Sequence, residues 1–181
     1  MTPASSTRRS RKGATLLQLC LGISVGMVLI GAIVPALQRR ARAGRTAEAV
    51  DRLALLYQHT QTYWAGQQVG PVAPARSTLH NLPASTPLTP AIVPAGHAVT
   101  DPPETWTSPT WNALEFRFED SHYYAYQFDS QGERTTAAFT ARACGDLDGN
   151  GIASTFERAG RANGRLELES PDGLWISHAM E

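Results

Sequence analysis

The pattern of apolar and polar positions divides the chain into four stretches of different character. Residues 14–37 contain no charged side chain, and in the next stretch, 38–64, apolar residues recur every three or four positions. Residues 65–110 are rich in proline, and from residue 111 apolar and polar residues alternate. This order predicts a long helix, an irregular connection and a set of β-strands.

The uncharged stretch 14–37 is long enough to cross a lipid bilayer, because a spanning helix needs about 20 apolar residues. It also exceeds the apolar core of a cleaved secretory signal, which is about 7–15 residues long. Four basic residues precede it: Arg8, Arg9, Arg11 and Lys12. Such charges favour a cytoplasmic amino terminus, although arginines that follow the stretch weaken this indication. We therefore expect a transmembrane helix.

The stretch 38–64 predicts an amphipathic continuation of this helix. Its apolar face consists of residues at spacings of three and four, namely Val50, Leu53, Tyr57, Thr60 and Trp64. A helix of this kind packs its apolar face on a domain. The alternative is an anchor followed by a separate short helix, with Gly44 as the point of weakness.

Proline dominates the third stretch. Nine of the twelve prolines lie between Pro71 and Pro109. Proline lacks a backbone donor and disfavours helix in the residue before it. We therefore expect extended or irregular backbone over residues 65–110.

The last stretch, 111–181, predicts an antiparallel β domain. Leu114, Phe116 and Phe118 alternate with charged residues, as in a half-buried strand. Two further strands follow after short turns, one around Tyr126 and one over residues 135–143, which makes a meander. Its apolar face would be covered by the amphipathic helix. Near the end of the chain, residues 165–169 form a short strand, and we expect the following Trp175 and Ile176 to dock on the sheet.

One loop carries candidate metal chemistry. Residues 146–157 fit the twelve-position EF-hand calcium loop, with glycine at the sharp turn. The candidate ligands are Asp146, Asp148, Asn150, Ile152 through its carbonyl, Ser154 and Glu157. The residues before the loop are predicted to form a strand. The site would therefore be a structural calcium site and not one of the paired sites of a calcium sensor. An Asx-rich turn that caps its own backbone without metal is the alternative.

Charge and composition exclude several function classes. The net charge is zero, and the basic residues lie mainly at the two ends of residues 14–37, so we predict no nucleic-acid binding. Two cysteines, Cys20 and Cys144, do not make a disulfide framework. The five histidines lack zinc-ligand spacing, and there is no nucleophile elbow or phosphate-binding loop. We predict that the chain is not an enzyme and has no cofactor other than the candidate calcium.

The junction between basic and apolar residues resembles a known processing signal. Lys12-Gly13 followed by Ala14-Thr15-Leu16-Leu17-Gln18-Leu19 is similar to the prepilin signature of type IV pilins and type II secretion pseudopilins. The resemblance implies that prepilin peptidase cleaves after Gly13 and methylates Ala14. Pro35 stands where many pilins have a helix-kinking proline. Gln18 stands where the family usually has glutamate, and members without that glutamate are often minor subunits.

The resemblance implies an α+β, pilin-like fold. A long N-terminal α-helix, half of it transmembrane, would pack on an antiparallel β-sheet, with a Pro-rich connecting region between them. Residues 1–13 would be the leader, 14–37 the transmembrane and filament-core helix, and 38–64 its amphipathic continuation. Residues 65–110 would be the variable connection and 111–181 the β domain.

The resemblance also implies partners and a location. The partners would be prepilin peptidase, other pilin or pseudopilin subunits, an inner-membrane assembly platform and the lipid bilayer. The chain would first be a single-pass inner-membrane protein with its C-terminal domain in the periplasm, and then part of a pilus or pseudopilus filament. The predicted function is that of a minor structural subunit of such a fimbrium or protein-secretion machine. The alternative is a signal-anchored periplasmic domain that binds calcium or adheres to surfaces and forms no filament.

Overall fold

The computed structural model describes residues 16–67, 80–170 and 173–178, and within the first range it describes the side chains of residues 18–28, 31, 33 and 44–67. The contacts divide the chain into two compact units, Met1–Arg40 and Ala41–Glu181. Helix α1 (Leu16–Gly66) is 51 residues long and runs through Gly44 without a break. It contributes residues to both units, and every strand belongs to the second unit.

The predicted transmembrane helix is not found. Within the described residues, no helical stretch is both long and apolar enough to cross a membrane. This finding contradicts the membrane-spanning part of the predicted fold class and the predicted single-pass location in the inner membrane.

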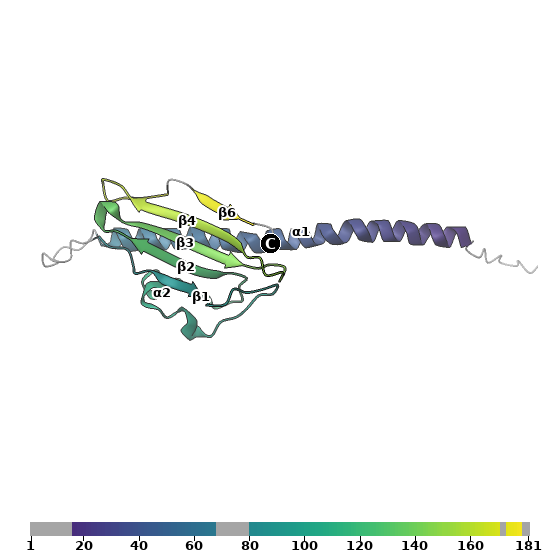
Figure 1. Ribbon diagram of the computed structural model, residues 1–181, viewed down its shortest axis with the longest axis horizontal. Helices are drawn as coiled ribbons and strands as arrows, with labels where there is room; N and C mark the ends of the chain where they lie inside the picture. Colours follow the sequence, from purple (N-terminus) through teal and green to yellow (C-terminus); the bar gives the residue numbers. More distant parts are fainter. Residues whose placement is uncertain (1–15, 68–79, 171–172, 179–181) are drawn as a thin grey trace, which may run out of the picture. The chain divides into compact units, whose positions relative to one another are not determined.

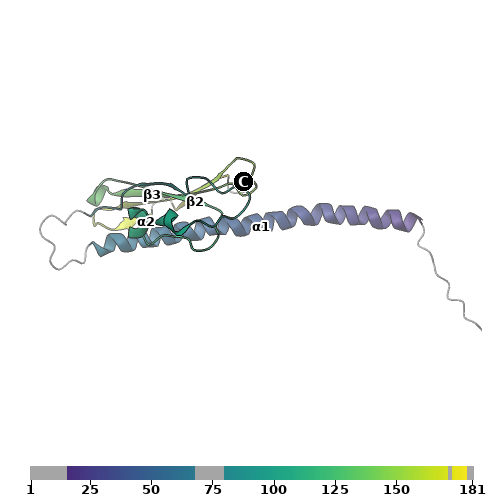
Figure 2. The same ribbon diagram turned by 90° about the horizontal axis from the view of Figure 1, so that it is seen from below.

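The second unit is built on a six-stranded antiparallel sheet. The strand order is β1-β2-β3-β4-β5, and β6 also pairs with β4. The strands are β1 (Thr86–Thr89), β2 (Ala125–Gln131), β3 (Ala138–Gly145), β4 (Ser154–Ala162), β5 (Leu168–Glu169) and β6 (Leu174–Ser177). Figures 1 and 2 show the C-terminal part of α1 running along one face of this sheet.

The face of α1 that packs on the sheet is close to the predicted one. Leu53, Tyr57, Thr60 and Trp64 are buried, and the Tyr57 ring lies 5.8 Å from that of Phe139 on β3, centroid to centroid. Val50 was predicted to belong to this face but is 37% exposed. The buried face is centred on Ala49 and Leu56, because the helical period of 3.6 turns position 50 away from the sheet.

The first predicted strand is wrong. Residues 109–113 form a short helix, α2 (Pro109–Ala113), whose start is capped by the Ser108 side chain accepting from the Trp111 N–H. No β-strand includes residues 114–120. The alternation nevertheless marked the buried side chains correctly, since Leu114, Phe116 and Phe118 are all buried. Pro at the first helical position and a Ser cap favour a helical turn over the strand that the alternation suggested.

The described part of the Pro-rich stretch is mostly irregular but well anchored. It contains β1 and a 3₁₀ turn, η1 (Pro103–Trp106). Between them, isolated bridges join Ala95 to Asp146 and Val99 to His122. The segment therefore lies beside the ends of β2 and β3, although it is far from β3 in sequence.

Aromatic side chains fill the space beside β2. The Trp106 ring lies within 6.3 Å of the rings of Trp111, Phe116, Phe118 and Tyr126, measured between centroids. These contacts join η1, α2 and the following loop to the sheet. At the opposite edge, Trp175 and Ile176 pair with β4 as part of β6 but remain 55% and 44% exposed, so their predicted docking buries less than expected.

Candidate functional site

The N-terminal part of α1 exposes an unusual amount of apolar surface. Among the described residues, seven large apolar side chains there are each half or more exposed: Leu19, Leu21, Ile23, Val25, Met27, Val28 and Ile33. At 100° per residue these positions are spread around the whole helix. A helix that is apolar on every side is normally buried among other apolar surfaces. This segment is therefore a candidate association surface.

The residues assigned to processing and assembly are only partly described. Gly13 and Ala14 lie outside the described residues. Gln18 lies in the first turns of α1 and is exposed. Pro35 lies within α1, and its side chain is outside the description. The structure thus describes Gln18 beside the exposed apolar side chains and leaves the predicted cleavage junction as a prediction.

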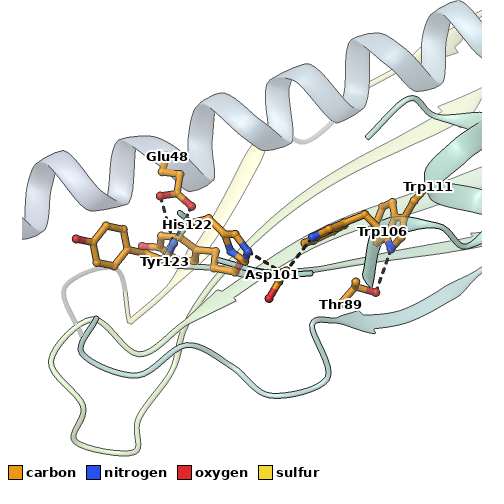
Figure 3. Close-up of polar contacts among 8 residues, drawn as sticks. Glu48, Thr89, Asp101, Trp106, Trp111, His122 and Tyr123 are labelled. Carbon is orange, nitrogen blue, oxygen red and sulfur yellow. Dashed lines mark hydrogen bonds and ion pairs between the residues drawn. The ribbon is translucent and has the colours of Figure 1, made fainter. Parts of the chain in front are cut away.

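A carboxylate on α1 fixes the helix to the sheet domain. Glu48 points from α1 toward the start of β2, where both its oxygens accept from the Tyr123 N–H at 3.0 and 3.3 Å (Figure 3). Burial raises the pKa of Glu48, while the bond from Tyr123 and the nearby charges of His122 and Arg52 lower it by less. This hydrogen bond links α1 to the sheet domain inside a mostly apolar interface.

Two arginines of α1 make further contacts with the sheet domain. The Arg45 guanidinium lies 4.7 Å from the centroid of the Tyr123 ring, and its Nη1 donates to the Leu147 carbonyl at 3.2 Å. Arg52 lies 4.6 Å from the centroid of the Phe118 ring. Cation–π contacts that are partly removed from water are worth about 1–2 kcal/mol each. Glu48 and these arginines therefore fix the rotation of the helix on its domain.

His122 is a fully buried polar side chain of the domain. Its Nε2 lies 2.9 Å from Asp101 Oδ2, which also accepts from Trp106 Nε1 at 3.0 Å (Figure 3). Its Nδ1 lies 2.8 Å from the Tyr124 carbonyl oxygen. Because a carbonyl only accepts, Nδ1 carries a hydrogen. A further proton is shared between Nε2 and the Asp101 carboxyl, so the two side chains form a buried charge-assisted pair.

The acidic loop is organised around Asp146. One of its oxygens accepts from the Gly149 N–H at 2.7 Å and the other from the Gly151 N–H at 2.9 Å, and Asn150 donates to the first. Burial alone would raise the pKa of Asp146, but these backbone hydrogen bonds outweigh it, and the pKa lies below its ordinary value. Asp146 thus caps its own loop in the manner of an Asx turn.

The remaining predicted calcium ligands do not converge with Asp146. Ser154 is fully buried and donates to the Gly145 carbonyl, whereas Glu157 pairs with Arg142 Nε at 2.5 Å. Both lie on β4 at an odd spacing, so they point to opposite faces of the sheet. An EF-hand shell needs both on one side.

The other three candidate ligands are turn residues. Asp148 accepts from the Asn150 N–H at 3.2 Å, and Asn150 accepts from the Ile152 N–H at 2.7 Å. Among the described residues, no group of three His, Cys, Asp or Glu side chains could hold a metal ion. The geometry therefore fits a self-capped turn and does not fit the closed EF-hand shell.

Sequence reasoning missed the polar residues that hold the domain together. His122 was considered only as one of five histidines without zinc-ligand spacing, and Asp101 and Glu48 were not singled out. A histidine next to a Tyr-rich strand and an aspartate amid prolines carry no periodic signal, because their pairing spans 21 residues. Glu48 stands 75 positions from Tyr123, so its role also depends on the tertiary fold.

No protein-family model matches the chain, and neither a curated protein nor a solved structure is significantly similar to it. The function is therefore inferred from the residues themselves.

Proposed function

We propose that this chain is a structural subunit of a type IV pilus or type II secretion-like pseudopilus and assembles through the N-terminal part of α1. The observation that carries the proposal is the set of seven exposed apolar side chains between Leu19 and Ile33. In the assembly, the same helices of neighbouring subunits would cover these side chains. The prepilin-like junction at Gly13 and Ala14 is the sequence support.

The exposed apolar side chains supply a driving force for association that is comparable with its cost. Burying a large aliphatic side chain is worth about 1.5–3 kcal/mol, so seven such side chains offer on the order of 10 kcal/mol before the costs of association. Those costs are about 4–15 kcal/mol. One helix pair covers only part of a helix that is apolar on all sides, and several neighbours are needed. This requirement fits a filament core better than a dimer.

The rest of the molecule suits a structural part. Within the described residues, the loop of Asp146 satisfies its own backbone, and the polar groups of His122, Asp101 and Glu48 are used in holding elements together. Glu48 and Arg45 hold the C-terminal part of α1 on the sheet domain within the second unit. Gln18, which carries no charge where the family usually has glutamate, suggests a minor subunit.

Mass spectrometry of the purified mature protein tests this proposal. Processing by prepilin peptidase predicts a first residue Ala14 with an N-methyl group. Gly13→Ala should abolish this product, because the peptidase recognises the glycine, while Gly22→Ala within α1 serves as the control and leaves processing unchanged. An intact Met1, or a first residue near Gly44, would contradict the proposal.

A further inference from the structure

A groove lies between the end of α1 and the turn after α2, entirely within the second unit. Its volume is about 470 Å³, and its lining includes His59, Tyr63, Ala113 and Glu115. None of its lining residues belongs to the exposed apolar part of α1 or to the loop of Asp146. Tyr63 also packs against the hydrophobic core, but the proposed assembly gives none of these residues a role.

His59 supplies the groove with a hydrogen-bond acceptor. Its Nδ1 lies 2.7 Å from the Leu114 carbonyl oxygen, and a carbonyl can only accept, so Nδ1 carries the hydrogen. In the neutral ring Nε2 is then an acceptor. Within the described part of the chain, Nε2 has no hydrogen-bond partner.

Glu115 adds a negative charge at a position that normally belongs to glycine. It follows α2 with a φ of 48°, in the left-handed region. Its N–H donates to the Asn112 carbonyl, and the Phe116 N–H donates to the Trp111 carbonyl at 2.9 Å. This is the Schellman arrangement, whose left-handed residue is usually glycine, because a side chain there is strained.

The charge of Glu115 is also uncompensated among the described residues. The nearest arginine in sequence, Arg117, pairs instead with Glu119 at 3.3 Å. A strained residue that keeps a free carboxylate beside a free imidazole acceptor is better explained by a ligand than by stability.

We propose that this groove binds a cationic group with N–H donors, a guanidinium or a primary ammonium, carried on an apolar stem. Glu115 contacts the charge, His59 Nε2 accepts one N–H, and Tyr63 and Ala113 contact the stem. A zinc ion fits less well, since His59 and Glu115 supply only two ligands and a zinc site takes at least three from the protein.

The test uses the full chain in detergent micelles and a defined probe, N-acetyl-arginine methylamide. We expect a saturable shift of the His59 ring signals in the NMR spectrum. The neutral isostere N-acetyl-citrulline methylamide should give none. Equal responses to the two probes, or no saturable response to the arginine probe, would overturn the proposal.

Substitutions at Glu115 separate binding from stability. Glu115→Gln keeps the strained backbone and should lower the affinity for the arginine probe about tenfold. The matched control Glu119→Gln should leave this affinity unchanged. Glu115→Gly should abolish binding and at the same time raise Tm, because glycine relieves the left-handed strain. A Glu115→Gly variant that binds as well as the wild type would refute the role of the carboxylate.

The same cationic chemistry occurs in free small molecules and in arginine-rich polypeptide, including residues 36–46 of this chain. A synthetic peptide of residues 36–46 distinguishes the two sources. Binding about tenfold or more tighter than the probe would identify a polypeptide as the ligand. Equal affinity would identify a free small molecule. Mass spectrometry of the proposed processing is independent of these measurements, so either proposal can fail without the other.

Discussion

At the residue scale, His122 and Asp101 form a polar pair that is buried inside the domain. The His122 side chain is 1% exposed and that of Asp101 10% exposed, so each charge depends on the other and not on water. Breaking a buried pair by removing one partner costs about 3–5 kcal/mol, because the other is left without compensation.

His122→Ala should therefore lower the free energy of unfolding by about 3 kcal/mol. In the double variant Asp101→Asn with His122→Ala, no charge is left buried, and Trp106 Nε1 can still donate to the amide oxygen. The double variant should lose less than the sum of the two single changes. Urea denaturation of the four proteins gives the coupling energy, and strict additivity would show that the pair does not act as described.

Little of this residue-scale arrangement could be predicted from the sequence. The apolar positions of α1 were found because helical periodicity is local, and Leu53, Tyr57 and Trp64 are indeed buried. His122 could not be found, since its partners Asp101 and Trp106 come from a separate, irregular segment.

At the scale of elements, Glu48 joins α1 to the sheet domain, and its contribution to the free energy of unfolding depends on pH. Its pKa is raised above the ordinary 4.5, chiefly by burial. The folded state therefore binds more protons than the unfolded state as the pH rises from 4.5 toward the folded pKa. The stabilising contribution of Glu48 is complete below 4.5 and is lost as the pH rises through the folded pKa.

Glu48→Gln should remove this pH dependence, because glutamine keeps an acceptor for the Tyr123 N–H but does not titrate. Relative to the wild type, the variant should gain stability between about pH 4 and pH 7. Denaturant unfolding of both proteins at the two pH values measures the change. A relative loss of stability over that range would contradict the direction of the shift. Asp51→Asn, an exposed change on the same helix, is the control.

The loop between β3 and β4 is held by the Asp146 carboxylate. Asp146→Ala removes the acceptor of three backbone N–H groups and should lower the free energy of unfolding by about 3 kcal/mol. The loss should be the same with EDTA and with calcium, because the bonds are internal to the loop. Thermal unfolding in both buffers measures it, and a calcium-dependent rise of Tm in the wild type alone would support the predicted metal site.

The loop also explains the limits of motif reading. The spacing of residues 146–157 fits an EF-hand at every ligand position, but β4 begins at Ser154 and turns Glu157 to the other face of the sheet. Similarly, the alternation after residue 111 predicted a strand where Ser108 and Pro109 start α2. In both cases the spacing does not specify the backbone on which the residues lie.

At the scale of the whole molecule, the exposed apolar part of α1 and the sheet domain belong to different compact units. Changes in one should therefore leave the folding of the other intact. This separation allows assembly to be tested without unfolding the domain.

Ile23→Glu places a charge within the proposed association surface, where an unpaired charge is expensive to bury. We expect the yield of assemblies that sediment after detergent removal to fall by at least about tenfold, with Tm of the domain unchanged. Ile92→Glu is the matched control, because Ile92 is 83% exposed but lies in the second unit. Unchanged sedimentation of Ile23→Glu would argue against assembly through this surface.

The sequence by itself determined the apolar N-terminal stretch, the helical face that packs on a sheet, and most of β2 and β3, whereas it gave no sign of β4. These features depend on local periodicity, which a few neighbouring residues establish. It also carried the prepilin-like junction at Gly13 and Ala14, which lies outside the described residues.

Only the tertiary structure decided which polar groups meet. The pairing of His122 with Asp101, the contact of Glu48 with Tyr123, the separation of Ser154 from Glu157 and the groove of His59 and Glu115 all join or separate residues through the packing of different elements. Hydrogen bonds and ion pairs act over a few ångströms and leave no period in the sequence, so their partners are fixed only when the chain folds.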